Sequence, residues 1–229
     1  MDLIIEDLQD DIKPILENTD YLTAFLCGSK SMNLSHALSD TDIWILSESN
    51  DTEKMKYKGC EVKIVALSDL NKAIESALNG DRLSVFSQIL LSHVYHGIPI
   101  IKADAFDDIN QKIPWDLIIR NMISDRLRGY KFYKQDAYKF KDIEEMLSAR
   151  FCYQRASDNL IDAYLFCNGL LIVKDKWRLK SFEKQNNALF NEFIAMYLDI
   201  WSSNDLERFS KKFDKTCSGI FELINTFEK

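Results

Sequence analysis

The residues best suited to chemistry lie in residues 25–46, FLCGSKSMNLSHALSDTDIWIL. An apolar run ends at Gly28-Ser29, and Asp40 and Asp42 stand directly before a second apolar run. A glycine lets a phosphate approach the backbone, and a serine hydroxyl and the amides that open a helix donate hydrogen bonds to it. Side chains two residues apart on an extended chain point to the same face, so the two aspartates present adjacent carboxylates. Such a pair suits Mg²⁺, which binds oxygen ligands and bridges them to substrate phosphates.

Each of these features is common when it occurs alone. Gly-Ser after an apolar run is usually a turn, and Asp-x-Asp is usually a solvated turn. Their order and spacing here, with apolar runs on both outer sides, resembles the signature of the polymerase-beta-type nucleotidyltransferase superfamily. The resemblance covers residues 26–67 and implies an α/β (α+β) nucleotidyltransferase domain with a small mixed sheet.

The same resemblance assigns roles to individual residues. It implies that Gly28, Ser29 and Lys30 bind the nucleotide, and that Asp40 and Asp42 are catalytic metal ligands. Lys30 follows Gly-Ser directly, where relatives often carry arginine, and there its ammonium would reach a triphosphate. The alternative for Lys30 is a solvated lysine without a role.

Relatives carry a third carboxylate on the next strand, and here two alignments compete. Residues 59–65, GCEVKIV, offer Glu61 as the third catalytic metal ligand, but an equally natural alignment places Lys63 there. The two side chains share a face of the strand because they are two residues apart. A lysine in that position would pair with an aspartate and replace one metal ion, leaving a site that binds a nucleotide without transferring it. We favour Glu61, because a third acid on the correct face fits the family pattern.

The remaining polar candidates have simpler interpretations. Asn33 stands where many relatives have glycine, and asparagine tolerates the left-handed backbone that such a turn requires. His36 is expected to be a solvated residue, and His93 and His96 are expected to be structural or on the surface. The five cysteines form no C-x-x-C pair, which favours buried free thiols over disulfides or a zinc site.

The pattern of apolar residues predicts two domains, 1–112 and 113–229. The first alternates helices and strands, and the second, after Pro114, has helical spacing throughout and is predicted to be an all-α bundle. The expected strands span 21–27, 42–46, 60–67 and 97–101, and the expected helices span 3–16 with a possible break at Pro14, 30–38, and 70–91 with a break near Asn79-Gly80. Further helix breaks are expected at Gly129, Gly169 and residues 202–204.

Two segments of the second half carry a pattern of their own. Residues 126–141 interleave cations with aromatic residues, which suits base stacking but more often marks a helix with an aromatic core stripe and a lysine-rich wet face. Residues 156–169, followed by Lys176-Trp177, resemble the helical C-terminal domain of kanamycin-type antibiotic nucleotidyltransferases. This half contains no histidine, which disfavours a ribonuclease role.

Charge and composition narrow the range of partners. The net charge is −7, with −9 on residues 1–112 (10 Lys and Arg against 19 Asp and Glu) and +2 on the rest (19 against 17). An acidic first half disfavours sequence-independent nucleic-acid binding, which depends on cations that contact phosphates. The longest apolar run is far shorter than a membrane helix requires, and the acidic N-terminus MDLIIEDLQDD is not typical of a signal or transit peptide. We therefore expect a cytoplasmic protein, monomeric or homodimeric, that does not bind membranes.

The resemblance to these nucleotidyltransferases implies a Mg²⁺-dependent enzyme that moves AMP from ATP onto a hydroxyl of a small acceptor, such as an antibiotic, with the nucleotide between the two domains. A tRNA or protein acceptor is the enzymatic alternative. A catalytically inactive nucleotidyltransferase-fold protein that binds or regulates a partner is the alternative from another class.

Overall fold

The computed structural model describes residues 2–17, 19–35, 39–49, 52–171 and 174–227. Contacts within the chain divide it into two compact units, Met1–Trp115 and Asp116–Lys229. We call them the sheet unit and the helical unit and describe each by itself.

One mixed sheet organises the sheet unit. Its strands are β1 (Tyr21–Cys27), β2 (Thr41–Ser47), β3 (Glu53–Tyr57), β4 (Cys60–Ala66) and β5 (Ile98–Ile101). Their order is β3-β4-β2-β1-β5, in which only the β2–β4 pair is parallel among the described residues. The mixed sheet that the sequence predicts is therefore present, with β2 near its centre.

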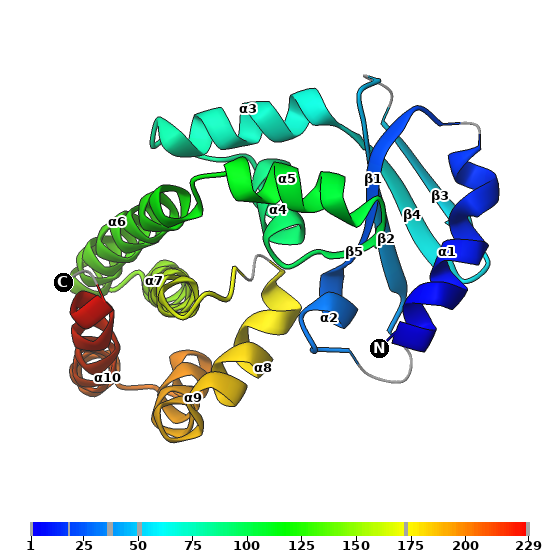
Figure 1. Cartoon of the computed structure of the whole chain (residues 1–229). Helices are drawn as coiled ribbons and strands as arrows, with labels where there is room; N and C mark the ends of the chain where they lie inside the picture. The colour runs from blue at the N-terminus through cyan, green and yellow to red at the C-terminus, as the bar shows by residue number, and fades with distance from the viewer. Residues whose placement is uncertain (1, 18, 36–38, 50–51, 172–173, 228–229) are drawn as a thin grey trace. The chain divides into compact units, whose positions relative to one another are not determined.

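Helices cover both faces of this sheet. They are α1 (Asp2–Leu16), α2 (Gly28–Ser31), α3 (Leu67–Leu78), α4 (Val85–Tyr95) and α5 (Ala103–Lys112). Figure 1 shows α1 on one side of the sheet and α4 and α5 on the other. On the α1 side, Ile12 packs with Ile43 and Val62 in a core from which water is excluded. On the opposite side, the ring of Trp44 contacts His93 of α4 with centroids 4.5 Å apart.

Most of the elements expected in this unit are present, and the differences have local causes. The four predicted strands form, and the predicted break near Asn79-Gly80 separates α3 from α4. Pro14 stays inside α1, where it removes only one hydrogen bond near the helix end. The helix predicted over 30–38 is instead the four-residue α2, which begins at Gly28; residues 36–38 lie outside the described residues. Strand β3 and helix α5 are additional elements that the apolar pattern did not predict.

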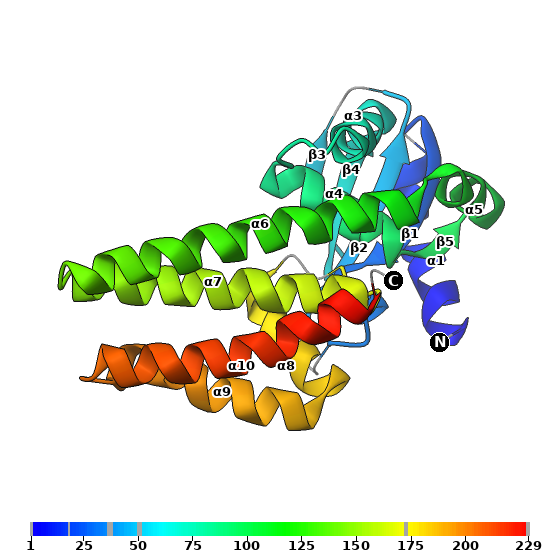
Figure 2. The same cartoon turned by 90° about the vertical axis from the view of Figure 1, so that its left-hand side faces the viewer.

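The helical unit is all-α in its described residues, as predicted. Its helices are α6 (Trp115–Asp142, which starts on the last residue of the sheet unit), α7 (Met146–Cys167), α8 (Asp175–Gln185), α9 (Asn187–Ser202) and α10 (Leu206–Phe227). Figures 1 and 2 show α6, α7, α9 and α10 running side by side as a bundle. The predicted break at Gly169 falls between α7 and α8, and the one at residues 202–204 falls where α9 ends, at Ser202.

The predicted break at Gly129 is wrong, since α6 continues through this residue. A Cβ atom at Gly129 would lie 2.6 Å from Oδ1 of Asn159 on α7. The glycine therefore lets the two helices approach closely instead of ending one of them. The aromatic stretch 126–141 lies within this one helix, with Tyr130 buried and Phe132 exposed.

Candidate functional site

The Gly-Ser turn and the second aspartate of the motif are in direct contact. Cys27 at the end of β1 pairs with Asp42 on β2, so the next residue, Gly28, lies against the Asp42 side chain. A Cβ atom on Gly28 would lie 2.2 Å from Oδ2 of Asp42, and the backbone φ of Gly28 is +70°. Only glycine has both the room and the conformational freedom for this position. The absence of a side chain at Gly28 thus lets the Asp42 carboxylate pack directly against the backbone.

Glu61 stands beside Asp42 in the sheet. The two residues are register partners in the parallel β2–β4 pair, and partners in register project their side chains to the same face. The following residues, Ile43 and Val62, point the other way into the α1 core and are fully buried. The carboxylates of Asp42 and Glu61 therefore lie side by side on the face opposite α1. Both side chains are half-buried there.

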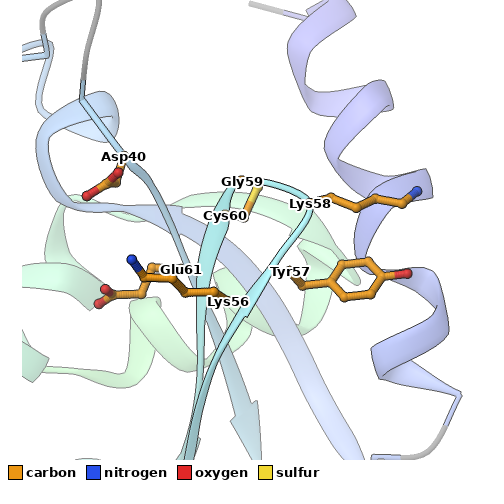
Figure 3. Close-up of a pocket in the computed structure, with 7 residues that line it drawn as sticks. All are labelled: Asp40, Lys56, Tyr57, Lys58, Gly59, Cys60 and Glu61. Atoms are coloured by element: carbon orange, nitrogen blue, oxygen red, sulfur yellow. The ribbon is translucent and has the colours of Figure 1, made fainter.

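Asp40 reaches the same region from the segment before β2. It helps to line a pocket of about 260 Å³ at the β3–β4 turn, lined by Asp40, Lys56, Tyr57, Lys58, Gly59, Cys60 and Glu61. Figure 3 shows the carboxylates of Asp40 and Glu61 on one side of this pocket, while Tyr57 and Lys58 extend toward α1. Lys58 is held there by Asp11 at 3.0 Å, which raises the pKa of the lysine.

Lys30 lies toward the other face of the sheet. Its ammonium donates a hydrogen bond to Oγ1 of Thr41. Thr41 and its register partner Cys60 alternate with Asp42 and Glu61 and therefore point to the α1 side. Ser29, which the resemblance assigns to phosphate, is buried at 5% exposure. The hydrogen bond to Thr41 is the contact that the structure shows for Lys30, and its contact with a phosphate stays a prediction.

The turn after α2 confirms one expectation. Asn33 has a φ of 55°, the left-handed conformation predicted for it from the asparagine in this turn. Its amide donates to the Lys30 carbonyl, and the Leu34 amide donates to the Ser29 carbonyl at 2.8 Å. These bonds close the turn behind the Gly-Ser segment.

Lys63 packs on aromatic rings. Its ammonium lies 4.8 Å from the centroid of Trp44 and 4.3 Å from that of Phe86. Burial lowers its pKa, and the nearby charge of Lys54 lowers it further, against the opposing effect of Glu61. Lys54, on β3, is instead the lysine that pairs with Glu61, at 2.9 Å.

A metal ion fits these carboxylates in a limited way. Among the described residues, no group of three or more His, Cys, Asp or Glu side chains is arranged to hold a metal. Mg²⁺ commonly binds one or two protein carboxylates and completes its shell with water and substrate phosphates. The adjacent carboxylates of Asp42 and Glu61, with Asp40 nearby, suit that mode better than a substrate-free cage of three carboxylates.

The histidines fill structural positions where the structure describes them. His93 is buried against Trp44, and burial lowers the pKa of His96 to about 4. His36 lies outside the described residues. None of the five cysteines, all of which lie in the described residues, forms a disulfide; four are buried and Cys167 is half-buried. These observations agree with the structural role expected for the histidines and with buried thiols.

Sequence reasoning missed the lysines of β3, Lys54 and Lys56, because it did not predict the strand that carries them. The signal was present as the alternation Lys54-Met55-Lys56-Tyr57, in which only every second residue is apolar. Because Glu53, Lys54 and Lys56 are three of its five residues, the segment is too polar for this alternation to predict a strand.

Comparison with known proteins supports the fold. No protein-family model matches the sequence, and no curated protein matches it. Among solved structures, the chain is similar to a nucleotidyltransferase-like protein from Exiguobacterium sibiricum 255-15, with a TM-score of 0.51 and 10% sequence identity. The alignment covers 97% of this chain and 75% of that one. At such low identity the likeness concerns the fold alone.

Among the described residues, no helix combines the length and the apolar character needed to cross a bilayer.

Proposed function

We propose that the protein is a metal-dependent nucleotidyltransferase that moves AMP from ATP onto a hydroxyl group of a small acceptor molecule. The observation that carries this proposal is the contact between Gly28 and the Asp42 carboxylate, with Glu61 beside Asp42 in the sheet. It joins the two halves of the motif, the Gly-Ser turn and the acidic pair, at one place. The nucleotidyltransferase-like fold agrees with this assignment.

Each residue has a role in the proposed reaction. Gly28 and Ser29 would lie against the phosphates of ATP, and Asp40, Asp42 and Glu61 would hold Mg²⁺. The cation would supply charge neutralisation for the transferred phosphate group. The acceptor oxygen would form a bond to the α-phosphorus as the bond to pyrophosphate breaks, and the proton of the acceptor hydroxyl would pass to water. Positioning and charge neutralisation supply most of the catalysis in such a reaction.

The net charge of the first half of the chain favours one chemical class of acceptor. A cationic, hydroxylated small molecule, such as an aminoglycoside-like antibiotic, suits residues 1–112 with their net charge of −9. The similarity of residues 156–169 and Lys176-Trp177 to kanamycin-type enzymes favours the same class. A tRNA or protein acceptor is the alternative to be tested beside it.

The test is a transfer assay with α-labelled ATP and Mg²⁺ against small hydroxylated molecules, tRNA and proteins. We expect label on one acceptor class and release of pyrophosphate. Asp42→Asn should reduce the rate about 1000-fold, because it removes several kcal/mol of charge stabilisation. The matched control is Asp107→Asn, an exposed carboxylate on α5, which should retain full activity. Full transfer by a folded Asp42→Asn protein rejects the proposed function.

A specific observation also favours a second function. Glu61 is paired with Lys54, and no three-carboxylate group forms in the described residues, which suits a protein that binds a nucleotide without transferring it. ATP binding that depends on Mg²⁺, with no pyrophosphate released to any acceptor in the panel, distinguishes this binding protein from the enzyme.

A further inference from the structure

Three lysines surround Glu61 on the carboxylate face of the sheet. On β3, Met55 and Tyr57 pack against the α1 core, so Lys54 and Lys56 point to the opposite face. Lys56 is the register partner of Glu61, and Lys54 is the register partner of Lys63. Lys54, Lys56 and Lys63 therefore share this face with the carboxylates of Glu61 and its register partner Asp42.

Lys54 takes a diagonal path to Glu61. Its direct neighbour on β4 is Lys63, and two like charges opposite each other in a sheet repel. The Lys54 ammonium instead lies 2.9 Å from Oε1 of Glu61. The Lys63 ammonium is accommodated separately, over the rings of Trp44 and Phe86.

This ion pair is easy to break. The Lys54 side chain is 59% exposed and that of Glu61 is 32% exposed, so water screens their attraction. Exposed pairs of this kind contribute little to stability and exchange partners readily. A cation that competes for Glu61, or an anion that competes for Lys54, can therefore separate them.

The exposed ammonium of Lys54 has a second anionic partner in the phosphates of the proposed substrate. Lys30 is held on Thr41, whose side chain points to the α1 side, so the lysines of β3 and β4 are the cations placed on the carboxylate face. We propose that Lys54 neutralises Glu61 while the site is empty and moves to the phosphates of the nucleoside triphosphate when a divalent cation binds Glu61. This inference rests on the proposed function and adds a positioning residue to its site. It also accounts for the lack of a three-carboxylate metal group among the described residues.

The first arm of the test measures binding of Mn²⁺ alone by calorimetry. Lys54→Gln should bind Mn²⁺ about two- to five-fold more tightly than the unchanged protein, the range that an exposed ion pair supports. Glutamine is used because β3 is an edge strand, where an apolar side chain invites pairing with a second chain. The control is Lys72→Gln, which removes a lysine from an exposed ion pair with Asp69 on α3 and should leave Mn²⁺ affinity unchanged.

The second arm measures the opposite effect. Binding of inorganic triphosphate in saturating Mg²⁺ should weaken a few-fold in Lys54→Gln, because a phosphate contact is lost. In a Glu61→Gln background, Lys54→Gln should no longer tighten Mn²⁺ binding, since the carboxylate that both cations share is absent. A change in both directions from one substitution is not expected of a merely structural lysine.

The outcomes separate this inference from the proposed function. If Asp42→Asn loses Mn²⁺ binding while Lys54→Gln binds Mn²⁺ as the unchanged protein does, the inference is overturned and the proposed function stands. If neither the unchanged protein nor Lys54→Gln binds Mn²⁺, or if Asp42→Asn binds it normally, both are overturned. Equal gains in Lys54→Gln and Lys72→Gln reflect general charge and also overturn the inference.

Discussion

Gly28 is constrained twice, by its backbone and by its neighbour. Its φ of +70° disfavours any side chain, and the Asp42 carboxylate occupies the place of a Cβ atom. Gly80, after α3, has a φ of +71° with no atom within 4 Å of the corresponding position. A side chain at either glycine would therefore meet the same backbone strain, but only at Gly28 would it also collide with a neighbouring side chain.

We predict that Gly28→Ala costs more stability than Gly80→Ala and also displaces Asp42. Gly80→Ala should cost about 1–2 kcal/mol from backbone strain alone. Gly28→Ala should add about 1–3 kcal/mol for overpacking and weaken Mn²⁺ binding at least about 10-fold. Urea unfolding and calorimetry check the two quantities. Equal losses of stability with unchanged Mn²⁺ affinity would show that the glycine does not position the carboxylate.

The sequence predicts the glycine and the carboxylates of the site, but it does not predict which lysine pairs with them. Gly28 and Asp42 are recognisable because their spacing is fixed by a strand, a turn and a strand, all of which are local. Whether Glu61 or Lys63 stands beside the aspartates depends on the register of a parallel pair between distant segments, which no local pattern sets. The structure places Glu61 beside Asp42 and Lys63 beside Trp44. The pairing of Lys54 with Glu61 depends on a second register and was not predicted.

Among the elements, those with a strong apolar period were predicted and those that depend on partners were not. The strands over Tyr21–Cys27 and Cys60–Ala66 are apolar enough to be recognised alone. Strand β3 has two lysines in five residues and is held by hydrogen bonds to β4 at the edge of the sheet. Gly129 was predicted to end a helix because glycine has low helix propensity, but close packing against Asn159 overrides that preference.

Buried charges link the helices of the helical unit. Asp162 on α7 is 4% exposed and accepts a hydrogen bond from Nε of Arg178 on α8 at 2.6 Å. Arg126 on α6 lies 3.3 Å from the same carboxylate. Asp175 also pairs with Arg178, at 2.8 Å, but its side chain is 77% exposed.

We predict that Asp162→Asn destabilises the protein by about 3 kcal/mol, because Arg126 and Arg178 lose the buried carboxylate that both contact. Arg178 keeps a second, largely buried ion pair, with Asp158 at 3.4 Å. Asp175→Asn, which removes an acid from the same arginine in an exposed position, should cost less than about 1 kcal/mol. The loss of helical circular dichroism in urea measures both. Similar costs for the two variants would mean that burial does not strengthen the role of Asp162.

The division of the whole chain into two units has a consequence for its thiols. Cys27 and Cys60 belong to the sheet unit, and Cys152, Cys167 and Cys217 belong to the helical unit. Burial raises the pKa of Cys60, Cys152 and Cys217, which lowers the fraction of reactive thiolate in the folded protein. Cys167 is half-buried and is the most accessible of the five.

We predict that a thiol reagent labels Cys167 first in the native protein and that the other four react only as their unit unfolds. If the two units unfold separately, Cys27 and Cys60 become reactive over one range of urea concentration, and Cys152 and Cys217 over another. Mass-spectrometric mapping of the labelled cysteines at each concentration identifies the two sets, and Cys167→Ser should remove only the early reaction. Simultaneous labelling of all four buried thiols would mean that the chain unfolds as one cooperative unit, because each thiol can be labelled only when the core around it opens.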